Sequence, residues 1–239
     1  ALSGYLVQFG PSYPIFAAAG FSAASIVATA VLLPPSPAVQ AEGHQWDWRA
    51  YTGPLRDRMV ASRFFQFFLS QFAISTFFSG FALFAERRFT HGGLAFGTRE
   101  VGYTFAYLGL VGIVFQGALG PLVKRAGESR LVQSGFGLAA CSFALLVRAQ
   151  GLVGVATAMT LFAVGTAVLR PNLTGLISQR TARHQQGVML GLMQSLQSLA
   201  QIVAPMAGGA LIEGRWLREW ALVGGVACVV GFFAAAGRR

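Results

Sequence analysis

The residues best suited to chemistry form a polar stripe inside an uncharged segment. Gly187–Ile212 contains no charged residue, and this length is sufficient for a helix to cross a hydrocarbon core about 30 Å thick. Four amides and hydroxyls recur in it at spacings of three and four: Gln194, Gln197, Ser198 and Gln201. They therefore share one helix face. Because polar groups facing lipid would lack partners, the stripe is expected to face protein or a water-filled cavity.

A further group of polar residues is a candidate for the same cavity. It lies among many phenylalanines at four-residue spacing and consists of Gln71, Ser75 and Ser79. Aromatic walls with a few amides suit an amphiphilic organic molecule. The alternative is that these groups hydrogen-bond between helices or pack in the core, and both interpretations stay open.

Arg170 is the charge that lies well inside a hydrophobic segment. Seven residues, or about 10 Å of helix, separate it from Ile177, so the side chain could snorkel toward the head groups. However, Thr166 and Thr174 share its helix face, and Pro171 removes a backbone donor and leaves a carbonyl free. We therefore predict that Arg170 faces the interior and pairs with carbonyls, an acidic group or an anionic substrate.

The elements that must position these residues are membrane-spanning helices. Of 239 residues, 54% are hydrophobic and 11% are charged, whereas soluble domains carry about 25% charged residues. Seven stretches are long enough, or nearly so, to cross a bilayer: Tyr13–Leu33, Phe64–Ala85, Val101–Val123, Leu131–Val147, Leu152–Ile177, Gly187–Ile212 and Trp220–Ala236. The sequence thus predicts an all-α membrane protein, a helical bundle.

The net charge of +10 reflects membrane topology rather than nucleic-acid binding, because the basic residues lie between the apolar segments. Alternate connections place eleven Lys and Arg residues on one side and six on the other. This bias predicts that the C-terminus is cytoplasmic. The three histidines fall in connections without metal-ligand spacing, and Cys141 and Cys228 are expected to be small core residues. No nucleophile–base pair or phosphate-binding loop is evident, so neither an enzyme nor a bound cofactor or metal is expected.

One connection, GPLVKRAGESR, carries a resemblance to a known family. Gly120 and Gly127 permit a tight reversal there, Lys124, Arg125 and Arg130 are basic, and Glu128 or Ser129 can cap the next helix. The pattern resembles the second copy of the conserved cytoplasmic loop of the major facilitator superfamily. The following LRPNLTGLISQRTARHQQGVMLGLMQSLQSLAQIVAPMAGGALIE is similar to helices ten and eleven of its drug/proton antiporters of tetracycline-efflux type.

The resemblance implies a piece of a twelve-helix transporter. Residues 1–33 would hold the end of helix five and helix six, residues 34–59 a cytoplasmic linker, and residues 60–239 the C-terminal six-helix domain. Helices seven, eight, ten and eleven would surround a substrate cavity, with nine and twelve at the periphery, and the loop from Gly120 to Arg130 would act in conformational change. The positions of Gln116, Tyr103 and Tyr107 in helix eight would make them cavity residues, and core packing is the alternative.

Such a protein would lie in the cell inner membrane among lipids and export small organic molecules by proton-coupled alternating access, which would require the missing N-terminal half. The alternative is a facilitator-like protein that assembles or stabilises a membrane complex without transport.

Overall fold

Helix length in this chain follows the uncharged segments. The computed structural model describes residues 6, 10, 12–32, 53, 56–91, 94–149, 151–181, 185–214 and 216–237. Within these ranges six helices are long and apolar enough to cross a membrane, and one bent helix pair gives a seventh candidate. The predicted all-α fold class is therefore confirmed.

The chain divides into two units, residues 1–47 and residues 48–239. In the first unit, α2 spans Tyr13–Leu32 and has no buried residue. The division falls inside the predicted linker of residues 34–59. Most of that linker lies outside the described residues, so the domain boundary stays a prediction.

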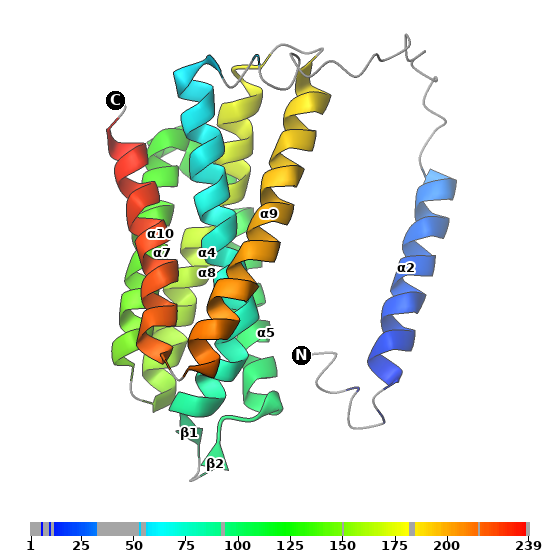
Figure 1. Cartoon of the computed structure of the whole chain (residues 1–239). Helices are drawn as coiled ribbons and strands as arrows, with labels where there is room; N and C mark the ends of the chain where they lie inside the picture. The colour runs from blue at the N-terminus through cyan, green and yellow to red at the C-terminus, as the bar shows by residue number, and fades with distance from the viewer. Residues whose placement is uncertain are drawn as a thin grey trace. The chain divides into compact units, whose positions relative to one another are not determined.

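The second unit is a helical bundle. Its first helix, α4 (Arg58–Arg88), is followed by β1 (Thr90–His91) and β2 (Leu94–Ala95), an antiparallel pair of two-residue strands that the sequence did not predict. The helices α5 (Thr98–Gly117), α6 (Leu119–Ala126), α7 (Glu128–Arg148), α8 (Gly151–Ser178), α9 (Gln186–Glu213) and α10 (Leu217–Ala236) complete it. Within this unit α4 and α9 run side by side in the same direction (Figure 1).

The helices of this unit are not equally embedded. α7 packs extensively against α8 and α10, and α4 packs against α9, α10 and α8. In contrast, α5 packs mainly on α8, and α9 packs mainly on α4. α10, one of the two helices expected at the periphery, also exposes apolar side chains such as Leu222, Val226 and Phe233, which suit contact with lipid. The unit thus has a core of α4, α7, α8 and α10 with α5 and α9 attached.

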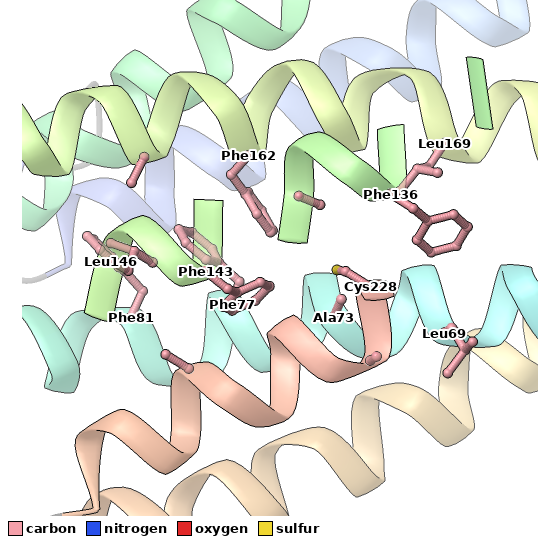
Figure 2. Packing of buried hydrophobic residues seen from close by; sticks show 14 of the residues in the cluster. Leu69, Ala73, Phe77, Phe81, Phe136, Phe143, Leu146, Phe162, Leu169 and Cys228 are labelled. Atoms are coloured by element: carbon pink, nitrogen blue, oxygen red, sulfur yellow. The ribbon is translucent and has the colours of Figure 1, made fainter. Parts of the chain in front are cut away.

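Phenylalanines fill that core, and glycines let the helices approach them. Phe77 stacks on Phe162 with ring centroids 3.9 Å apart, and Phe143 lies beside both rings (Figure 2). A Cβ atom at Gly224 of α10 would lie 2.4 Å from the Phe143 ring, a distance that real side chains do not reach. Because lipid is as apolar as the core, such shape matching, rather than hydrophobicity, associates these helices.

The span formed by α5 and α6 is bent by 55° at Ala118. Pro121 cannot donate a hydrogen bond to the Gly117 carbonyl, and its ring clashes with that carbonyl, which accounts for the bend. Gly120 therefore lies within α6 rather than in the expected reversal. The chain reverses at Gly127 instead, where φ is +79°, a conformation that favours glycine.

Candidate functional site

The α9 stripe lies on an exposed face, and α9 divides into distinct sectors. Its buried residues form a single line: Met189, Met193, Ala200, Ala204, Gly208 and Ile212. Gln194, Ser198 and Gln201 are exposed on one flank of that line, within a sector of about 60° at ~100° per residue. The other flank carries exposed Leu199, Ile202 and Met206. One flank of α9 thus presents amides, and the other is mainly aliphatic. Ser195 is also exposed on the aliphatic flank, but its hydroxyl donates to the Gly191 carbonyl of the same helix.

The α4 stripe is placed differently along its length. Gln71 is buried, with 6% of its surface exposed, and Ser75 is partly exposed. Ser79 is exposed beside Gly208 of α9. α4 and α9 run in parallel (Figure 1), so moving back by four residues in both helices keeps the two positions at the same level. Starting from Ser79 and Gly208, this places Ser75 level with Ala204 and Gln71 level with Ala200. Gln71 is therefore enclosed by protein, where its Oε1 has no hydrogen-bond partner among the described residues, and only the serines border an exposed surface.

The polar residues of α5 do not form one group. Gln116, Tyr103 and Tyr107 are all exposed, but Gln116 follows Tyr107 by nine residues, which is about half a turn in angle. Phe105, on the Gln116 side, contacts Phe78 of α4, whereas Tyr107 contacts Thr160 of α8. Gln116 therefore lies on the opposite side of α5 from Tyr103 and Tyr107, so the three expected cavity residues do not share one face.

The tyrosine side of α5 borders a pocket of about 530 Å³ against α8. Its lining combines charged, hydroxyl and tyrosine side chains of α5 with apolar residues of α8 and with Phe96, which precedes α5: Phe96, Arg99, Glu100, Tyr103, Thr104, Tyr107, Leu152, Val155, Ala156 and Met159. The Tyr107 hydroxyl lies 2.8 Å from Thr160 Oγ1 and joins the two helices at its inner end. This volume lies within the usual range for small-molecule sites.

Arg170 is exposed on α8, and its guanidinium makes no hydrogen bond to any residue in the described ranges. The Thr166 and Thr174 hydroxyls do not contact it, since they donate to the carbonyls of Phe162 and Arg170. Tyr107 of α5 and Thr160 of α8 are in contact. Gly117 follows Tyr107 by ten residues, and Arg170 follows Thr160 by ten residues. Arg170 is therefore expected near the level of the α5–α6 bend. Whether it snorkels or pairs inside the complete protein stays a prediction.

The predicted conformational loop is tied to two neighbouring helices. Glu128 accepts hydrogen bonds at 3.0 and 3.1 Å from Nε2 of Gln179, the residue that follows the end of α8. Arg63 of α4 donates to Ser129 Oγ at 3.2 Å. Gly127 and Arg130 line a second pocket of about 640 Å³ here, while Lys124 and Arg125 are exposed in α6. Neither Glu128 nor Ser129 caps α7 as expected, because Gly127 is the N-cap residue.

Sequence reasoning missed several of these residues. Arg99 counted only toward membrane topology, although it lies one helical turn from Tyr103 and donates to its hydroxyl at 3.3 Å. The four-residue spacing of Arg99, Tyr103 and Tyr107 was a visible signal. The pairing of Glu128 with Gln179 had no such signal, because it depends on how α7 and α8 pack. Cys141 proved to be exposed, whereas Cys228 is buried as expected.

Comparison with known proteins gives the family. Residues 1–205 match the model of the Major Facilitator Superfamily. Multidrug resistance protein 2 of Bacillus subtilis (strain 168) is 25% identical over 88% of this chain and 53% of its own length. The class D tetracycline resistance protein of Salmonella ordonez is 28% identical over 86% of this chain and 52% of its own length. The class B protein of Escherichia coli is 33% identical over 58% of this chain and 33% of its own length.

The chain therefore spans about half the length of the curated relatives it matches. Its family and its apolar helices identify a multi-pass membrane protein of a transporter family. The helical bundle, the glycine-mediated packing and the match over residues 1–205 agree on one assignment: the chain belongs to the Major Facilitator Superfamily.

Proposed function

We propose that this chain is the C-terminal half, with the end of the N-terminal half, of a proton-coupled exporter of small organic molecules. The single observation that carries the proposal is the division of α9 into a polar flank and an aliphatic flank. If lipid surrounded this helix, the exposed amide and hydroxyl groups of Gln194, Ser198 and Gln201 would lack hydrogen-bond partners. The names of the relatives, which are multidrug and tetracycline resistance proteins, supply the kind of substrate.

In this proposal the cavity has one wall from this chain and one from the missing half. Ser75 and Ser79 of α4, Gln116 of α5, Arg170 of α8 and the polar flank of α9 would contribute to the wall. The well-packed core of α4, α7, α8 and α10 would move as one body, and rocking against the other half would expose the site alternately to each side. The hydrogen bonds from Gln179 to Glu128 and from Arg63 to Ser129 support the proposal that the loop from Gly120 to Arg130 takes part in that motion.

Proton coupling requires a titratable group in the membrane interior. The carboxylates of the described helices lie near helix ends: Glu86, Glu100, Glu128, Glu213 and Glu219. We therefore assign the coupling carboxylate to the missing half. The eleven-to-six distribution of Lys and Arg residues supports a cytoplasmic C-terminus in the cell inner membrane.

Cysteine accessibility in the complete protein tests the cavity wall. After Cys141 and Cys228 are replaced, single cysteines at Gln194, Ser198 and Gln201 should react with a small water-soluble thiol reagent. Matched cysteines at Leu199, Ile202 and Met206, on the aliphatic flank, should not. Equal inertness of all six positions would contradict the cavity and favour packing.

A transport assay tests the activity. Everted vesicles containing the complete protein should accumulate tetracycline when their interior is acidified, and a protonophore should abolish the accumulation. Residues 1–239 alone should not transport, because they supply only one wall. Uptake that ignores the proton gradient, or robust uptake by residues 1–239, would contradict the proposal, and the absence of any transport would favour a role in assembly.

A further inference from the structure

The pocket between α5 and α8 brings two opposite charges together at one end of the bundle. Arg99 and Glu100 occupy the first turn of α5, and both line the pocket. The positive end of the helix dipole favours Glu100 but disfavours Arg99, so helix stability does not account for the arginine. From the charge pattern and its surroundings, we propose that this pocket binds one phospholipid with a zwitterionic phosphoethanolamine headgroup.

Several hydrogen-bond donors in the pocket have no partner among the described residues and can bind a phosphate group. Arg99 donates from Nε to the Tyr103 hydroxyl at 3.3 Å, and its guanidinium lies 5.6 Å from the centre of that ring. These contacts hold the side chain, while its two Nη atoms make no hydrogen bond to a described residue. Since the Tyr103 oxygen accepts from Arg99, its own proton is free. The Nη groups and this O–H can together bind phosphate oxygens.

The pocket also contains hydrogen-bond acceptors that have no donor among the described residues and can bind an ammonium group. Glu100 Oε2 accepts from the Gly97 backbone N–H at 3.0 Å, whereas Oε1 has no partner among the described residues. The Thr160 hydroxyl donates its proton to the Ala156 carbonyl at 2.9 Å. The Tyr107 hydroxyl must therefore donate to Thr160, and its remaining lone pair accepts. Glu100 lies in the same helical turn as Arg99, so an ethanolamine ammonium beside the bound phosphate can donate an N–H to Glu100 Oε1, whereas a choline headgroup has no N–H donor.

Depth and apolar surroundings also suit a lipid. Arg99 is in the first turn, near the water interface, and Tyr107 lies about 12 Å deeper along the axis. Met159 and Val155 form an apolar floor beside them. Below the pocket, α5 exposes Leu110, Ile113 and Val114, along which an acyl chain can lie. Because Gln116 is on the opposite side of α5, this site is separate from the proposed transport cavity.

Native mass spectrometry of the full 239-residue chain, released from nanodiscs containing equal amounts of phosphatidylethanolamine and phosphatidylcholine, tests the proposal. The wild type should retain one phosphatidylethanolamine in preference to phosphatidylcholine. Arg99→Gln should lower its occupancy about tenfold, the usual scale for a lost charged hydrogen bond. Glu100→Gln keeps an oxygen for the Gly97 cap, so it should retain a bound lipid while losing the preference for ethanolamine.

Arg218→Gln is the matched control. Arg218 and Glu219 form the same charge pair in the first turn of α10, but neither lines the pocket. This variant should retain phosphatidylethanolamine like the wild type. Soluble phosphoethanolamine should not displace the lipid, because it lacks acyl chains. Retention of the two lipids in proportion to their supply, or equal losses in Arg99→Gln and Arg218→Gln, would overturn the proposal. The assay needs no transport, so its outcome is independent of the proposed function.

Discussion

α9 and α10 both pack against α4, yet they use their surfaces in opposite ways. α10 buries Trp220, Gly224 and Gly231 against large aromatic side chains of α4 and α7. α9 buries one line of residues that is small in its middle, at Ala200, Ala204 and Gly208, and leaves an amide flank exposed. The difference indicates that glycine-and-aromatic packing builds the rigid part of this bundle, while a loosely attached helix can keep polar groups available for a cavity.

The largest loss of stability should follow a substitution in the α10 packing. Gly224→Ala places a Cβ against the Phe143 ring, which is buried and cannot shift freely. We expect a loss of about 1–3 kcal/mol in the free energy of unfolding, measured as a lower thermal midpoint in detergent. Gly191→Ala in α9 is the control, because nothing lies within 4 Å of its Cβ position. Equal losses of unfolding free energy in the two variants would contradict the difference in packing between α10 and α9.

A somewhat smaller effect is expected where α4, α9 and α10 meet. A Cβ at Gly80 of α4 would overlap the Trp220 indole, which also lies over Gly208 of α9. Gly80→Ala should destabilise by about 1–2 kcal/mol, and adding Trp220→Phe should recover part of that loss by making room. A double-mutant cycle measures the coupling. Strict additivity of the two changes would show that the indole does not set the approach of these helices.

Loss of a single hydrogen bond at the end of α9 should cost less. Arg87 of α4 donates to the carbonyl of Ile212, in the last turn of α9, where helix carbonyls lack partners within the helix. Arg87→Gln should cost about 1 kcal/mol and raise amide hydrogen exchange in residues 209–214. Arg218→Gln, which removes an exposed charge at the start of α10, should leave that exchange unchanged.

The smallest effect on stability, and the largest on transport, is expected at Arg170. Its side chain is exposed, so Arg170→Ala should change the free energy of unfolding by less than about 0.5 kcal/mol. In the complete protein the same change should abolish transport, and Arg170→Lys should restore only part of it because lysine lacks the planar guanidinium. Wild-type transport by Arg170→Ala would show that the arginine only snorkels.

The helices could be predicted from the sequence because their signal is local. An apolar run of sufficient length is a property of one segment, so the predicted Gly187–Ile212 corresponds to Gln186–Glu213 in the structure, and Leu152–Ile177 corresponds to Gly151–Ser178. The bend at Ala118 was also local in origin, since Pro121 marks it. It was missed because Gly120 next to this proline was interpreted as a turn.

The site could be predicted only in part because it depends on which helices are neighbours. A stripe such as Gln71–Ser79 records which residues share a face, but not that α4 turns Gln71 inward. The Arg99 pocket needs α8 beside α5, and no pattern within either helix specifies that contact. The amide stripe of α9 could be predicted as one helix face from its spacing, whereas its expected place against protein or a water-filled cavity stays a prediction.

The length of α4 has a consequence for the membrane around it. Its 31 residues extend about 46 Å, but only the 22 residues from Phe64 to Ala85 lie between Arg63 and Glu86, or about 33 Å. This interval is close to the thickness of an ordinary hydrocarbon layer. Hydrophobic mismatch would arise in a thinner or thicker bilayer, and the helix would respond by tilting. Acyl-chain length is therefore a physical variable that acts on the whole bundle through α4.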